Sequence, residues 1–331
     1  MTSMMGEAMA KLKRAFLAVA ILLASAVASA ADTYPSRLVT IVAPSAPGGL
    51  YSLFARIVAS KLEARLGQTF VVENRPGAAS VVGAQAVARA APDGYTLMVA
   101  SGATMAVNVT LHKTLPYDPA IDFVPIALIA RVPEVLVVDP ALPIRSLADL
   151  AAYAKSHAVT FASAGPGTAQ HLEGEMLWRA LGVEMTHVPY KGALPALNDV
   201  MGGHVTMMFS PVANALSQIA AGKVRALGLA ARDRVAALPD VPPLAEIGAE
   251  GFEAAGWFML VAPAATPVPI VDRLHAELRA ILADPALRQQ LIGQGLIPVD
   301  TPSLDELRSY VREQIVYWRD TLTKIGLAGI E

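Results

Sequence analysis

The first part of the chain alternates short apolar runs with longer segments in which apolar residues recur every three or four positions. Residues 38–43 form an apolar run bounded by Pro44, which predicts a buried strand. Residues 51–66 carry the helical spacing and Gly67 follows as a stop signal, which predicts a helix. The same criteria predict a strand over 69–72, a helix over 80–90 and a strand over 95–100.

The alternation returns after Pro133. Ser146 with Asp149 three residues later marks the start of a helix. Expected strands cover residues 135–138, 160–162, 185–188, 205–209 and 226–229, and expected helices cover 169–181 and 194–202. Strands separated by helices of this length predict parallel βαβ units with right-handed crossovers. The expected fold class is therefore α/β.

The last third of the chain is predicted to be mostly helical. Apolar side chains at 270, 274, 278, 281 and 282 form one stripe, and Pro285 stands at the tolerated first position of another helix. Ser303 and Glu306 form a capping box ahead of a third amphipathic stretch. No linker separates the two strand–helix sets, so the chain is expected to cross between two domains more than once.

The first thirty residues have the three-part pattern of a secretory signal peptide. A basic region with Lys11, Lys13 and Arg14 precedes an uncharged, mostly apolar stretch over 15–27, and Ala28-Ser29-Ala30 supplies a small-x-small cleavage site. The alternative is a buried N-terminal helix. We expect residues 1–30 to be a cleavable signal peptide and the mature protein to be soluble in the periplasm.

Composition excludes several classes of function. The formal charge is −2 and no Lys/Arg-dense run occurs in the body, so we expect no nucleic-acid partner. The chain has no cysteine, which excludes a disulfide scaffold, an iron–sulfur cluster and a thiol nucleophile. The six histidines are never two, three or four residues apart, so no metal site is expected. No cofactor is expected either, because Gly165-Pro-Gly167 begins like a dinucleotide fingerprint but Gln170 stands at the position of its third glycine.

Catalytic motifs are missing as well. The chain contains no G-x-S-x-G elbow, no G-x-x-x-x-G-K-[ST] loop and no H-E-x-x-H pair. Glu173 and Glu175 are two residues apart and fall on different faces of the predicted helix. We therefore expect them to be solvated charges rather than an acid/base pair.

Two loops rich in glycine and proline are the candidate ligand sites. Pro44-Ser-Ala-Pro-Gly-Gly49 leaves the first strand and leads into a helix, and Ser163-Ala-Gly-Pro-Gly-Thr168 does the same in the second half. A helix start offers free backbone N–H groups and the positive end of the helix dipole, so it holds an anion without a charged side chain. One such loop in each half suggests two surfaces that close on a carboxylate from opposite sides.

A series of short motifs resembles the Bug/TctC-like extracytoplasmic solute receptors, the binding-protein component of tripartite tricarboxylate transporters. They occur in family order from Tyr34 almost to the C-terminus. The matching elements are Tyr34-Pro35, Pro47-Gly48-Gly49, Val72-Glu-Asn-Arg-Pro-Gly77, Ala91-Pro-Asp-Gly-Tyr-Thr96, Leu115-Pro-Tyr-Asp118, Ser163-x-Gly-x-Gly-Thr168, His187-Val-Pro-Tyr-Lys-Gly192, Leu238-Pro-Asp-Val-Pro242 and Trp257-Phe258.

The resemblance implies a type II periplasmic-binding-protein fold, with two α/β lobes and a ligand cleft between them. The first lobe would take residues 31–133 and 257–331, and the second would take 134–256. Transferred residue by residue, the resemblance implies a ligand site that comprises Pro47, Gly48, Gly49, Leu50, Tyr51, Ser52, Ser101, Thr104, Ser163, Gly165, Gly167, Thr168, Tyr190, Lys191 and Ser210. For Tyr190 and Trp257, packing at the hinge or in the core is an equal alternative.

Two departures from the family pattern bear on the ligand. Many relatives carry Asp where this chain has Ser52, and many carry Asp where Ser210 stands. An ammonium group buried without an acidic partner is costly, so an amino-acid ligand is disfavoured. We expect a carboxylate without an amine, either a di- or tricarboxylate or an aromatic acid.

The resemblance also implies the mode of action. The lobes would close on the ligand by a hinge motion, and a monomeric receptor would deliver it to the large and small membrane subunits of a tripartite tricarboxylate transporter. It would not be an enzyme. Two alternatives stay open: a receptor that reports to a signalling system, and an exported hydrolase that uses Ser163 or Ser101 with a histidine such as His171.

Overall fold

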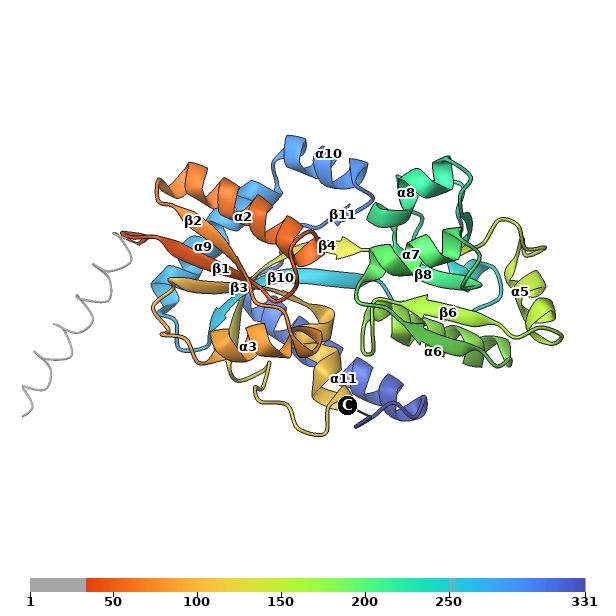
Figure 1. Ribbon diagram of the computed structural model, residues 1–331. Coiled ribbons are helices and arrows are strands. Elements are labelled where there is room, and N and C mark those ends of the chain that lie inside the picture. The colour runs from red at the N-terminus through yellow and green to blue at the C-terminus, as the bar shows by residue number, and fades with distance from the viewer. Residues whose placement is uncertain (1–33, 251, 253, 331) are drawn as a thin grey trace, which may run out of the picture.

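The structure is a computed structural model that describes residues 34–250, 252 and 254–330. The described chain forms two lobes, each built on one β-sheet with helices around it (Figure 1). The predicted signal peptide, residues 1–30, lies outside the described residues. No helix in these described ranges is long and apolar enough to span a membrane.

The first lobe contains a six-stranded sheet in the order β11-β4-β10-β3-β1-β2. Its strands are β1 (Val39–Ala43), β2 (Phe70–Asn74), β3 (Thr96–Ser101), β4 (Phe123–Val132), β10 (Gly256–Pro263) and β11 (Ile297–Pro298). β1 pairs in parallel with both β2 and β3, as predicted for βαβ units. β10 runs antiparallel to β3 and β4, and β11 runs antiparallel to β4.

Helices cover both faces of this sheet. They are α2 (Leu50–Leu66), η1 (Ala78–Ser80), α3 (Val81–Ala88), η2 (Ala103–Val107), α4 (Asn108–Leu111), α9 (Val268–Leu282), α10 (Pro285–Gly293) and α11 (Leu304–Lys324). One buried cluster joins α2, α9 and α10 to the sheet, and another joins α3, α4 and α11 to its other side. The predicted capping box is confirmed, because the Ser303 hydroxyl accepts from the Glu306 amide and the Glu306 carboxylate accepts from the Ser303 amide.

The second lobe contains a five-stranded sheet in the order β7-β6-β8-β5-β9. Its strands are β5 (Glu134–Val138), β6 (Thr160–Ser163), β7 (Thr186–Pro189), β8 (Met207–Pro211) and β9 (Arg225–Leu229). Its helices are α5 (Leu147–Ala154), α6 (Ala169–Leu181), α7 (Ala193–Met201), α8 (Val212–Ala220) and the short η3 (Leu244–Glu246). β6 is parallel to β7 and β8, whereas β5 is antiparallel to β8 and β9.

The prediction of purely parallel units is therefore wrong for the strands next to the lobe crossings. β4 continues through Pro133 directly into β5, without the helical crossover that a parallel connection requires. The second crossing leads from the segment after η3 into β10. Both sheets are mixed for this reason.

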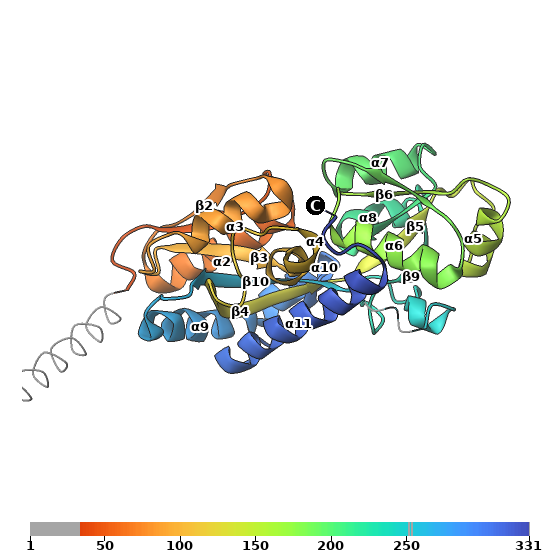
Figure 2. The ribbon, with the colours of Figure 1, turned by 90° about the horizontal axis from the view of Figure 1, so that it is seen from below.

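The C-terminal segment makes a further connection between the lobes. α11 lies along the first lobe and extends toward the second (Figure 2). After its end, the Ile325 carbonyl accepts a hydrogen bond of 2.7 Å from the Arg179 guanidinium of α6. A few residues later, the Gly329 amide donates to the Thr110 carbonyl of α4 at 2.9 Å. The tail thus links a helix of the second lobe to a helix of the first.

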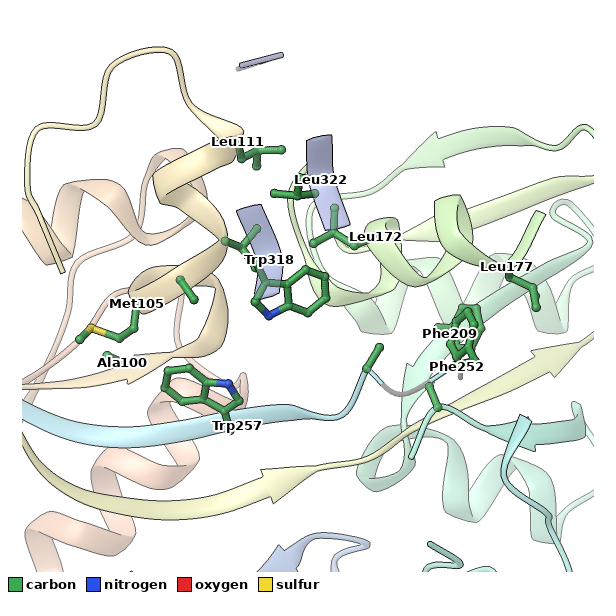
Figure 3. Packing of buried hydrophobic residues seen from close by; sticks show 14 of the residues in the cluster. Ala100, Met105, Leu111, Leu172, Leu177, Phe209, Phe252, Trp257, Trp318 and Leu322 are labelled. Atoms are coloured by element: carbon green, nitrogen blue, oxygen red, sulfur yellow. The ribbon is translucent and has the colours of Figure 1, made fainter. Parts of the chain in front are cut away.

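The largest buried cluster extends from one lobe into the other. Leu111 of α4, Leu172 of α6, and Trp318 and Leu322 of α11 belong to it and lie together at the junction (Figure 3). Each of the four is at least nine-tenths buried. The lobes are therefore in apolar contact at this junction.

Candidate functional site

The loop before α2 is exposed and has room around its glycines. Pro47, Gly48 and Gly49 are all exposed, and a Cβ atom added at either glycine would meet no atom within 4 Å. Gly48 has φ +94°, a conformation that glycine adopts without strain. Gly49 is the N-cap of α2, and no described side chain caps this helix. The first-turn amides of α2 are thus available to an anion.

Hydroxyl groups gather beside this loop. The Tyr51 hydroxyl lies 2.5 Å from the Ser101 hydroxyl and 3.1 Å from that of Thr104. Ser80, which the sequence analysis did not select, lies 2.8 Å from Thr104. The Tyr51 ring packs edge-on against Phe258 at 4.9 Å between centroids. The structure therefore brings Tyr51, Ser101 and Thr104 together, as three adjoining polar groups on an apolar support.

Ser52 and Leu50 have different surroundings. Ser52 is 2% exposed, and its hydroxyl accepts a hydrogen bond of 2.7 Å from the Asn74 amide. Asn74 also donates to the Ser45 carbonyl at 2.9 Å, so it fixes the start of the loop to the end of β2. Leu50 is half-buried and packs against the core of the first lobe.

The loop before α6 has Ser163, Gly165 and Gly167 buried and is hydrogen-bonded within itself. The Gly165 amide donates to the Ser163 hydroxyl at 3.0 Å, and the Thr168 hydroxyl donates to the Gly165 carbonyl at 2.7 Å. The Gly167 amide donates to Nδ1 of His171 at 3.1 Å. Thr168 is the N-cap residue of α6, but its side chain makes no capping hydrogen bond to the helix. The loop amides thus have partners, and the first turn of α6 provides the amides for an anion.

Ser163 contacts a histidine, though not the one that the hydrolase alternative named. Its hydroxyl lies 2.6 Å from Nε2 of His187, and the His187 ring stacks on His171 at 4.1 Å between centroids. Burial, with a smaller contribution from the nearby His171, lowers the pKa of His187 to about 4. His187 is therefore neutral at pH 7.

The other predicted site residues of the second lobe, Tyr190, Lys191 and Ser210, differ in their contacts with this loop and in their burial. The Tyr190 amide donates to the Ser163 carbonyl at 3.0 Å, but its hydroxyl donates to Asp199 at 2.5 Å. Burial and the bond to Asp199 raise the pKa of Tyr190 to about 12. Lys191 is exposed, and Ser210 is fully buried in β8, where its hydroxyl donates to the Pro211 carbonyl.

Both helix N-termini lie toward the junction of the lobes. The N-terminal end of α2 is at the side of its lobe that faces the second lobe (Figure 1). On α6, Leu172 lies nearer to the first lobe than Leu177 does (Figure 3). A Cβ atom at Gly167 would overlap the Leu111 side chain of α4, so the loop before α6 touches the first lobe.

The prediction that Glu173 and Glu175 are solvated is wrong. Glu173 is fully buried, and neither of its carboxyl oxygens has a hydrogen-bond partner among the described residues. Burial, followed by the nearby carboxyl of Glu134, raises its pKa well above the ordinary value. Glu175 is mostly buried and pairs with Arg179. Gly174 permits this arrangement, because a Cβ there would overlap the Phe161 ring, so α6 packs closely on β6.

Residues 54–327 match the family described as the Tripartite tricarboxylate transporter family receptor, TctC. The chain belongs to this family. Protein BugT of Bordetella pertussis is 36% identical to it over 300 residues, which cover 89% of this chain and 91% of BugT. The family resemblance expected from the motifs is therefore confirmed, and the family is one of solute-binding receptors.

Solved structures confirm the two-lobe periplasmic-binding-protein fold. The R. palustris protein Rpa4515, solved with adipate, superposes with a TM-score of 0.84 at 34% identity and covers 89% of this chain and 99% of its own. MatC from Rhodopseudomonas palustris, solved with bound malate, has a TM-score of 0.80 at 36% identity and covers 87% of this chain and 100% of its own. Both structures of relatives contain a dicarboxylate.

Proposed function

We propose that this protein is a periplasmic receptor that captures a small organic carboxylate between its lobes and carries it to a membrane permease. The supporting observation is that α2 and α6, one in each lobe, have N-termini without side-chain caps that lie toward the lobe junction. Their first-turn amides and dipoles hold an anion without a charged side chain. The adipate and malate of the two relatives support the carboxylate class.

The proposed lobes are residues 31–133 with 257–331, and 134–256, which rotate about the two crossings. The closed state is favoured because it adds contacts from the second lobe to a ligand that is already held by the first. The proposed ligand contacts in the first lobe are Pro47, Gly48, Gly49, Leu50, Tyr51, Ser52, Ser101 and Thr104. Those in the second lobe are Ser163, Gly165, Gly167, Thr168, Tyr190, Lys191 and Ser210.

The proposed ligand has no amine. Ser52 and Ser210 are uncharged, and both are almost fully buried. Ser52 already accepts a hydrogen bond from Asn74, so it offers an ammonium group no charge and little free acceptor capacity. A dicarboxylate, a tricarboxylate or an aromatic acid meets no such cost.

The proposed role is binding without chemical change. Ser163 and His187 are within hydrogen-bonding distance, as a nucleophile and base would be. However, a His187 pKa of about 4 makes a weak general base at neutral pH, and the Ser163 side chain is fully buried. This combination favours a structural role for the contact over hydrolysis. Turnover of a carboxylic ester by the purified protein would contradict the proposal.

Thermal unfolding with a panel of acids tests the function. Adipate, malate and benzoate are compared with aspartate and glutamate, and a ligand at one hundred times its Kd stabilises the protein by about 2.7 kcal/mol. Gly49→Val is expected to abolish this stabilisation without lowering stability, because φ at Gly49 is −88° and an added Cβ meets no atom within 4 Å. Stabilisation by aspartate or glutamate alone, or full ligand stabilisation of Gly49→Val, would contradict the proposed ligand or its site.

The cellular part of the proposal has separate tests. N-terminal sequencing of the exported protein is expected to begin at Ala31, after removal of residues 1–30. Light scattering is expected to give the mass of a monomer. Genes for the large and small permease subunits beside this one would support uptake, whereas a neighbouring sensor gene would favour the signalling alternative.

A further inference from the structure

One arginine interrupts an otherwise buried strand at the first lobe crossing. Arg131 is exposed, whereas the other nine residues of β4 are buried. It lies opposite Trp257 of β10 and Ile297 of β11 in the sheet. Its guanidinium makes no hydrogen bond or ion pair with any other residue that the structure describes. A cation is therefore held at the crossing without a protein partner.

A cavity of about 290 Å³ adjoins this arginine. Tyr310, Gln314, Tyr317 and Trp318 line its opposite wall, and their spacing places them along one side of α11. Ala254 and Ala255, just before β10, also line it. The cavity thus lies behind the lobe crossings, and none of the residues proposed for the cleft lines it.

Ring contacts and a hydrogen bond connect the residues of the α11 wall with one another and with Trp257. Trp257 packs edge-on against Tyr310 at 5.3 Å, and Tyr317 packs in the same way against Trp318 at 5.3 Å between centroids. The Trp257 indole donates to the Gln314 side-chain oxygen at 3.2 Å. That bond orients the Gln314 amide and leaves its NH₂ group without an acceptor among the described residues.

We propose that this cavity is a second binding site, for a small planar carboxylate such as an aromatic acid. Arg131 and the Gln314 NH₂ group donate to the carboxylate, and Tyr310 and Trp318 contact the ring. The volume lies just below the range for small-molecule pockets, about 300–1,000 Å³, which suits a single ring. Arg131 carries the charge among the described residues that line the cavity, and a cation favours an anionic ligand.

Arg131 and Ala255 also line a second cavity of about 290 Å³. Arg232, Asp233 and Arg234 line it together with aliphatic residues, and Arg234 is paired with Glu246 at 3.0 Å. It contains no aromatic side chain among its described lining residues. We assign the ring to the cavity beside α11, and Arg232 then provides a matched control.

Indole N–H signals of the ¹⁵N-labelled protein test the site during a benzoate titration. Trp318 lines the cavity and the Trp257 indole bonds to Gln314, so both signals are expected to shift. Trp178 on α6 has neither relation to the cavity and serves as the internal reference. The titration is repeated in Gly49→Val, which removes binding at the proposed cleft. Benzyl alcohol, which keeps the ring but has no carboxylate, is expected to bind much more weakly.

Variants separate this site from the cleft. In the Gly49→Val background, Arg131→Gln is expected to raise the benzoate dissociation constant about tenfold or more. Arg131→Lys is expected to give a dissociation constant between that of Gly49→Val alone and that of Arg131→Gln in the same background. Arg232→Gln and the exposed Arg89→Gln are expected to leave it unchanged. Unshifted Trp257 and Trp318 signals, or equal benzoate affinity in Arg131→Gln, would overturn the proposal. Adipate stabilisation of Arg131→Gln tests the cleft separately.

Discussion

In the first lobe the loop before α2 is exposed and open, whereas in the second lobe the serine and glycines of the loop before α6 are buried and hydrogen-bonded. Gly48 and Gly49 have free space on the side where a side chain would be. Gly165 and Gly167 are instead held by hydrogen bonds to Ser163 and His171. The two loops occupy equivalent places after a strand and before a helix, so their difference comes from their surroundings.

In the proposed function, this difference would divide the work of ligand binding between the two loops. The loop before α6 is already ordered by its own side chains, so it loses little conformational entropy when a ligand arrives. The loop before α2 has few such contacts, so the ligand must supply part of its order. Substitutions in the second-lobe loop should therefore reduce folding stability, and those in the first-lobe loop should mainly reduce ligand binding.

The largest effect is expected for Gly167→Ala. The added methyl group would overlap Leu111 of the first lobe, and φ at this position is +71°. Overpacking and the left-handed backbone together are expected to lower the free energy of unfolding by about 3 kcal/mol. Urea denaturation measures this loss in Gly167→Ala and in a control variant, Gly182→Ala. Gly182 has φ +64°, but no atom lies within 4 Å of an added Cβ. Equal losses in the two variants would show that the lobe contact at Leu111 contributes nothing.

A pH-dependent effect is expected beneath the same loop. Burial raises the pKa of Glu134 and Glu173 above the ordinary value of 4.5, so the folded pair holds protons that the unfolded chain releases. The contribution of the protonated pair to folding stability is complete below pH 4.5. It decreases as the pH rises toward the folded-state pKa, by up to about 1.4 kcal/mol per pH unit for each carboxyl. Glu173→Gln is expected to become more stable than the wild type as the pH rises from 5 to 8.

Denaturant midpoints across this pH range measure the effect. The exposed Glu63→Gln on α2 is the matched control, because the Glu63 side chain is not removed from water on folding. His187 acts in the opposite direction, since its lowered pKa makes the wild type less stable as the pH falls from 6.5 toward 4. A Glu173→Gln stability curve parallel to that of the wild type would mean that Glu173 is ionised in the folded protein.

The smallest effect is expected for Thr168→Val. It removes the hydrogen bond from the hydroxyl to the Gly165 carbonyl and keeps the side-chain shape, so unfolding should become easier by about 1 kcal/mol. Calorimetric titration with adipate is expected to show weaker binding as well. Thr266→Val loses a bond of the same length, 2.7 Å, to the Pro263 carbonyl away from the loop. The comparison fails if both variants change adipate affinity equally.

Local signals in the sequence identified most helices and the parallel strands. α6 was predicted over 169–181 and is found at Ala169–Leu181, because Thr168 and Gly182 mark both ends. β4 was not predicted as a strand. Pro125 lies inside it, and proline argues against a central strand. In the structure a register shift in the pairing of β4 with β10 lies next to Pro125, so the strand continues past it.

The sequence pattern predicts which loops form the candidate site, but it does not predict the side-chain contacts within that site. The glycine and proline pattern pointed to both helix starts. However, the Tyr51–Ser101 and Ser163–His187 contacts join residues 50 and 24 positions apart, which only the tertiary fold specifies. Glu173 was assigned to solvent from its two-residue spacing to Glu175. That rule ignores how closely Gly174 lets the helix approach the sheet.

The tail after α11 gives the two lobes a third tether besides the two strand crossings. Arg179 donates to the Ile325 carbonyl and the Gly329 amide donates to the Thr110 carbonyl, so the tail is attached to both lobes near the Leu111 contact. In the proposed hinge motion, the two strand crossings would allow the lobes to rotate and a third tether would limit how far they separate. We therefore expect the residues after α11 to set the amplitude of opening.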